Sequence, residues 1–160
     1  MADYVLCLDL DVAVLGNIDH LITWDDDVRL MQGSSNRLGQ RISHYNGSMW
    51  LCRSGARSHV SDDFTPERAI SAREDLIAIL GHEKPGSDQA WFSSALGPNE
   101  RTYGPDDGVY QYHAIRREPQ VPSDACMVFF AGNRKPWTPS VARHHPPLAR
   151  AYMRDFTRSR

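Results

Sequence analysis

The chain has 160 residues, a length that predicts one domain spanning 1–160 with a hydrophobic core. Its net charge of −2 excludes the broad basic field with which many proteins bind nucleic acid, so no nucleic-acid partner is expected. No apolar run approaches the roughly 20 residues that a transmembrane helix needs, so no transmembrane segment is expected.

The first predicted element is a central β-strand at residues 4–8, an apolar run that ends at Asp9-Leu10-Asp11. Alternate residues of a strand point the same way, so the pattern predicts that Asp9 and Asp11 lie side by side. Open α/β sheets bind ligands at the carboxyl ends of their strands, and paired carboxylates suit Mg²⁺ or Mn²⁺. The alternative is that both aspartates begin a turn.

The middle of the chain alternates strands and helices. One helical turn is predicted at 18–22, strands at 28–31 and 45–52, and a loop at 33–43. Within the second strand, Gly47 indicates a bulge or a close approach by another group. Helices are predicted from Thr65, a suitable N-cap, to about residue 80, and from Ser87 to Leu96 before Gly97.

The last third continues the alternation. Strands are predicted at 109–115 and 127–130, a loop at 132–139, and a final helix that begins after Pro146-Pro147. Trp50 and Trp91 are expected in the core. The succession of elements predicts an α/β fold with a mixed sheet flanked by helices.

The three cysteines each lie in an apolar, strand-like run. Their odd number and spacing favour buried free thiols in a reducing compartment, and the N-terminus lacks the pattern of a signal peptide. The cytoplasm is therefore the expected location. The cysteines are Cys7, Cys52 and Cys126.

Four segments follow one another in an order that resembles a known enzyme family. They are "YVLCLDLDVAVLGNIDHLI", "HYNGSMWLCRSG", "GSDQAWFSSAL" and "GNRKPW". Together they resemble the catalytic half of GT-A-fold glycosyltransferases, especially the family 8 type. The resemblance extends over about residues 4–137 and implies the C-terminal portion of a GT-A, Rossmann-like nucleotide-diphospho-sugar transferase fold. It also implies that a hexose is transferred from a UDP-sugar, with retention of anomeric configuration, to a glycan, lipid or protein acceptor.

The resemblance assigns roles around the donor diphosphate. Asp9 and Asp11 would ligate Mn²⁺ or Mg²⁺ bound to the diphosphate, and Asp9 would also approach the ribose or the sugar. Lys135 would neutralise the leaving diphosphate, and Trp137 would anchor the loop that contains Lys135.

The resemblance also assigns roles around the sugar. Asn46 would hydrogen-bond the transferred sugar, and Gly47 would let the sugar come close to the backbone. Asp88 would bind a sugar hydroxyl, and Gln89 would lie near the anomeric carbon.

The sequence departs from the family pattern at two places. The family's usual histidine before the "GNRKPW" loop is absent from 128–132, and only eight residues precede Asp9, where the family has a nucleotide-binding half. These departures favour a second interpretation, a non-catalytic, degenerate or truncated module that binds a sugar nucleotide or a partner. The second departure also predicts an open sheet edge at 4–8, covered by a second copy or a partner chain.

A third interpretation comes from the first motif alone. "LDLDVAVL" also resembles the first motif of haloacid-dehalogenase-type, metal-dependent phosphatases. In such an enzyme Asp9 would be the nucleophile and Asp11 the general acid and base.

Overall fold

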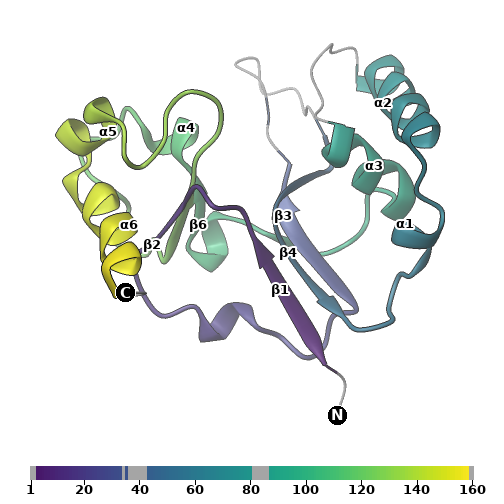
Figure 1. The fold of residues 1–160 in the computed structure, drawn as a ribbon, viewed down its shortest axis with the longest axis horizontal. Helices are drawn as coiled ribbons and strands as arrows, with labels where there is room; N and C mark the ends of the chain where they lie inside the picture. The colour runs from purple at the N-terminus through teal and green to yellow at the C-terminus, as the bar shows by residue number, and fades with distance from the viewer. Residues whose placement is uncertain (1–2, 34, 36–42, 81–86, 159–160) are drawn as a thin grey trace. The chain divides into compact units, whose positions relative to one another are not determined.

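The computed structural model describes residues 3–33, 35, 43–80 and 87–158 (Figure 1). The chain divides into two compact units. Unit 1 comprises Met1–Cys7 and Thr23–Tyr103, and unit 2 comprises Leu8–Ile22 and Gly104–Arg160. That residues 1–160 form one domain stays a prediction.

The sheet of unit 1 is mixed. Its strand order is β1-β4-β3-β5, with β3 antiparallel to β4 and parallel to β5. These strands are β1 (Tyr4–Leu8), β3 (Val28–Gln32), β4 (Tyr45–Arg53) and β5 (Thr102–Tyr103). Among the described residues β1 is an end strand, so its predicted central position is wrong, whereas the sheet edge predicted at 4–8 is confirmed. An apolar run reports how well the faces of a strand are covered, and it does not report how many neighbours the strand pairs with.

Three helices belong to unit 1: α1 (His59–Asp62), α2 (Pro66–Leu80) and α3 (Ser87–Leu96). Helix α3 packs on β4, and α1 and α2 pack on α3. The predicted N-cap is confirmed, because the Arg68 amide donates to Thr65 Oγ1 at 3.2 Å. Gly97 follows α3 with φ +70°, the left-handed conformation that ends many helices.

Two predicted features fall outside the described residues. They are the stop of α2 at Gly81 and most of the loop at 33–43.

Unit 2 contains a second mixed sheet of order β2-β7-β6, in which β7 is antiparallel to β2 and parallel to β6. Its strands are β2 (Val12–Val14), β6 (Val109–Gln111) and β7 (Met127–Phe129). Its helices are η1 (Asp19–Leu21), η2 (Pro105–Asp107), α4 (Tyr112–Ile115), α5 (Pro139–His144) and α6 (Pro146–Arg158). Helix α6 packs on β2, so mixed sheets with packed helices confirm the predicted α/β class.

Two predictions for unit 2 need correction. The strand expected at 109–115 ends at Gln111, and residues 112–115 form α4. Tyr112 and Ile115 stand three positions apart, and the helical turn buries both in one cluster with Val128 and Leu148. The final helix begins at Pro146, and α5 precedes it as a separate helix.

The free cysteines are confirmed, although only Cys126 is fully buried, and Cys7 and Cys52 are half-buried. In the part of the chain that the structure describes, no helix is both long enough and apolar enough to cross a membrane.

Replacing Thr65 with alanine removes the hydroxyl that caps α2. We expect Thr65→Ala to lower the free energy of unfolding by about 1 kcal/mol in a urea titration. Ser71→Ala, an exposed change in the interior of the same helix, is the control and should not destabilise the protein, because alanine favours helix. Equal losses in the two variants would contradict the capping role.

Candidate functional site

The two aspartates of the first motif lie in a bend. Strand β1 ends at Leu8 and β2 begins at Val12, so Asp9-Leu10-Asp11 joins two strands. Leu10 is 91% exposed, which shows that no apolar packing extends the strand through this segment. The expectation that Asp9 and Asp11 share one face of a strand is therefore wrong, because the chain leaves the sheet before both.

Asp11 is held by its backbone and by its side chain within unit 2. Its carbonyl oxygen accepts the Phe130 amide at 3.1 Å, beside the pairing of β2 with β7. Lys135 Nζ donates to Asp11 Oδ2, and the two side chains are 30% and 15% exposed respectively. Asp9 is exposed. The structure thus brings together Asp11 and Lys135, two residues that the motifs assign to the diphosphate.

Trp137 lies half-exposed on the same loop as Lys135. Its ring packs on Tyr152 of α6, with ring centroids 5.0 Å apart. Pro136, between Lys135 and Trp137, is buried. These contacts fasten the loop that presents Lys135.

The donor chemistry of the bend suits a divalent cation in part. Carboxylate oxygens of Asp9 and Asp11 are the type of ligand that Mg²⁺ and Mn²⁺ prefer, but the Lys135 ammonium already pairs with Asp11. Among the described residues there is no group of three His, Cys, Asp or Glu that could hold a metal ion. Two carboxylates alone would leave most of the coordination positions of such a cation to water or to a bound ligand.

In unit 1, the second motif forms a bulge, as Gly47 predicts. Leu30 pairs with Trp50 and Met31 pairs with Asn46, so β4 has three extra residues at 47–49 opposite one step of β3. Asn46 Oδ1 accepts the Ser48 amide at 2.8 Å, a side-chain turn that satisfies a backbone donor inside the bulge.

The bulge places Gly47 directly against Asp88. A Cβ added at Gly47 would lie 2.6 Å from Asp88 Oδ2 and 3.7 Å from Phe92 Cε2. Asp88 lies in the first turn of α3, where the helix dipole favours a carboxylate. The absence of a side chain at Gly47 thus allows a carboxylate to approach the β4 backbone, which is the close approach predicted from the sequence.

Polar contacts hold Gln89 near the start of β4. Its Oε1 lies 3.4 Å from the Ser43 hydroxyl, which donates to the Tyr45 carbonyl at 2.7 Å, and its own carbonyl accepts the Ser93 hydroxyl at 2.7 Å. Ser93 Oγ in turn accepts the His44 amide at 3.1 Å. Sequence reasoning missed Ser43 and Ser93 as positioning residues; the one-turn spacing of Gln89 and Ser93 was the available signal.

The predicted site residues thus form two groups, each within its own unit. The unit 1 group, which we name the bulge cluster, contains Asn46, Gly47, Asp88 and Gln89. The unit 2 group, which we name the bend cluster, contains Asp9, Asp11, Lys135 and Trp137.

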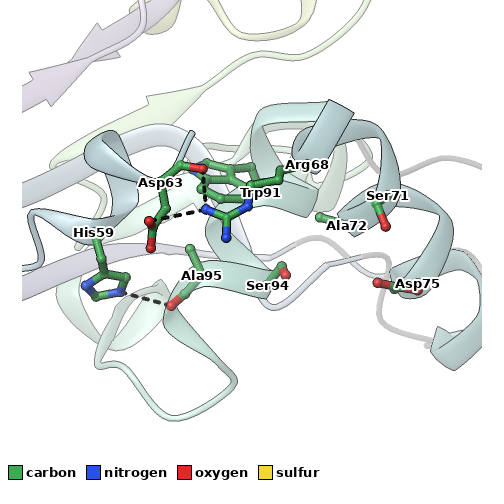
Figure 2. A pocket seen from close by; sticks show the side chains of 9 residues that line it. All are labelled: His59, Asp63, Arg68, Ser71, Ala72, Asp75, Trp91, Ser94 and Ala95. Carbon is green, nitrogen blue, oxygen red and sulfur yellow. Dashed lines mark hydrogen bonds and ion pairs between the residues drawn. The ribbon is translucent and has the colours of Figure 1, made fainter. Parts of the chain in front are cut away.

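A polar hollow of about 330 Å³ also lies in unit 1, among α1, α2 and α3 (Figure 2). Arg68 donates to the Asp63 carbonyl at 2.8 Å and pairs with its carboxylate at 3.2 Å, and His59 contacts the Ala95 carbonyl at 3.1 Å. The Arg68–Asp63 pair is more than half exposed and adds little stability. None of the predicted site residues lines this hollow.

No family model and no curated protein matches the chain. Among solved structures, the chain is similar to the crystal structure of a galactosyltransferase, LgtC, in complex with donor and acceptor sugar analogues. The identity is 14% and the TM-score 0.48, over 86% of this chain and 55% of that chain. The chain therefore spans about half the length of that galactosyltransferase.

A double-mutant cycle tests the contact between Gly47 and Asp88. We expect Gly47→Ala to destabilise the protein by about 1 kcal/mol, because the new methyl group overlaps the carboxylate. In an Asp88→Ala background the same change should cost at least about 0.5 kcal/mol less, measured by urea unfolding.

Gly16→Ala is the matched control, because its nearest atoms lie 4.0 Å from the added Cβ. A loss from Gly47→Ala that is the same in both backgrounds would show that the methyl group does not meet Asp88.

Proposed function

We propose that the chain is a glycosyltransferase domain that transfers a hexose from a UDP-sugar to a glycan, lipid or protein acceptor, with retention of configuration. The order of the four motifs supports this proposal. The main structural support is the approach of the Asp88 carboxylate to the backbone at Gly47, because a carboxylate beside a bare backbone edge suits a sugar hydroxyl.

The bend cluster supplies the charge that the leaving group requires. As the glycosidic bond breaks, negative charge grows on the β-phosphate of the nucleoside diphosphate, and Lys135 is the cation that stabilises it. Asp11 holds Lys135 in position before the donor binds. A Mg²⁺ or Mn²⁺ ion held by Asp9 and Asp11 would supply Lewis-acid stabilisation of the same leaving group.

The bulge cluster supplies the groups that orient the sugar. Asp88 accepts hydrogen bonds from a sugar hydroxyl, and the amide nitrogen of Asn46 donates to another, since Asn46 Oδ1 is occupied by Ser48. The sugar becomes positively charged in the transition state, so the oxygens of Asp88 and Gln89 stabilise it.

A second candidate function is a module that binds a sugar nucleotide without turnover. Two observations favour it: Asp11 already pairs with Lys135, and no third metal ligand stands near it among the described residues. For either function we propose a cytoplasmic location, because all three cysteines are free thiols.

Calorimetric titration of UDP into the purified chain with Mn²⁺ tests the proposal. We expect binding that needs the metal and is lost in the variant Asp9→Asn plus Asp11→Asn. Lys135→Met should weaken binding about tenfold or more, because a charge-assisted hydrogen bond to phosphate is lost.

Arg117→Met removes an exposed cation from the same unit and should leave UDP affinity unchanged. The proposal would be contradicted if the folded protein gave no heat with UDP. It would also be contradicted if the variant Asp9→Asn plus Asp11→Asn bound UDP as tightly as the unaltered protein. Sugar transfer to water or to an acceptor then separates the enzyme from the binding module.

A further inference from the structure

A hollow of about 520 Å³ in unit 1 has no part in the roles proposed so far. It lies within the size range of small-molecule pockets, about 300–1,000 Å³. Four aromatic side chains contribute to its wall: Trp50, Phe64, Trp91 and Phe92. Trp50 and Trp91 were expected in the core, but both are only half-buried.

Three polar groups of this wall are bonded to the protein itself. Trp91 Nε1 donates to the Val60 carbonyl at 2.8 Å, and Ser61 Oγ donates to the Ser58 carbonyl at 2.9 Å. Cys52 Sγ donates to the Arg53 carbonyl at 3.3 Å. A ligand in the hollow would therefore contact mainly aromatic and aliphatic surface.

The cation of the wall, Arg57, is neutralised. Its guanidinium lies 2.9 Å from the Glu100 carboxylate and 3.9 Å from that of Asp27. Its backbone has φ +53°, an uncommon conformation for a residue other than glycine, and such strain is concentrated at functional sites. An anionic group gains little here, so the charge balance favours a neutral apolar ligand.

Phe92 connects this hollow to the bulge cluster. It follows Asp88 by one turn of α3, and its Cε2 lies 3.7 Å from the Cβ position of Gly47. The centroid of its ring also lies 6.1 Å from that of Trp50, the residue at which β4 resumes its pairing with β3 after the bulge. Phe92 thus borders both the Asp88 carboxylate, which suits a sugar hydroxyl, and the apolar wall of the hollow, which suits a hydrocarbon group.

We propose that this hollow binds the apolar part of the acceptor, so that the acceptor is a glycoside with an alkyl or aryl aglycone. The inference rests on the proposed glycosyltransferase function and deepens it by naming the class of acceptor. The neutral, aromatic wall and its shared border with Asp88 are the observations that support it.

Titration with methyl, butyl, hexyl and octyl β-glucosides below their micelle concentrations tests this inference. Each buried methylene group should raise the affinity about fourfold. Binding is followed by tryptophan fluorescence, because Trp50 and Trp91 line the hollow. The methyl glucoside should bind too weakly to detect.

Ser61→Phe fills the hollow and should abolish the dependence on chain length, whereas Ser140→Phe, an exposed change on α5, should not. A second measurement uses the unaltered chain, so that it does not depend on either variant folding. Octyl glucoside should slow alkylation of Cys52 at least severalfold, mapped by mass spectrometry, and leave Cys126 unaffected.

Each outcome separates this inference from the proposed function. Affinity that does not rise with chain length, or alkylation of Cys52 that does not slow, would overturn the inference and leave UDP binding as found. If glucoside affinity rises with the length of the alkyl group but the protein does not bind UDP, the assignment of the ligand as an acceptor would be overturned.

Discussion

The bulge in β4 is the constraint on which the chemistry of unit 1 depends. Three residues inserted opposite one step of β3 place Gly47 against the first turn of α3, and Trp50 then resumes the pairing. Asn46 satisfies an amide inside the bulge, and Gly47 leaves the space that Asp88 occupies. Since a strand alternates its side chains between two faces, an insertion of odd length also reverses which face each later residue meets.

The corresponding constraint in unit 2 is the ion pair between Asp11 and Lys135. The pair is partly buried, where an unpaired charge would be costly, so each side chain fixes the other. A lysine held in this way loses little freedom when a phosphate binds, although the phosphate must compete with the carboxylate. A divalent cation on Asp11 would remove that competition, which gives a physical reason for the metal assistance that we propose.

Local signals in the sequence predicted much of the fold, and contacts between distant residues account for what they missed. Thr65 and Gly97 marked helix ends through backbone chemistry that neighbouring residues decide, and Gly47 marked the bulge for the same reason. The edge position of β1 depends on strand order, which the apolar pattern of residues 4–8 does not encode, so only the comparison with the family pattern predicted it. Asp11 and Lys135 are 124 residues apart, so only the resemblance grouped them, and it did not predict that they pair directly.

The central claim is that the bend cluster binds the diphosphate of the donor. The most direct test compares the affinities of UDP and uridine, with Mn²⁺, for the unaltered chain and for Asp11→Asn. We expect Asp11→Asn to weaken UDP about tenfold and to leave uridine unchanged, because uridine lacks the phosphates that the metal and Lys135 would contact. If Asp11→Asn changed the affinities of the two ligands alike, the claim would be contradicted.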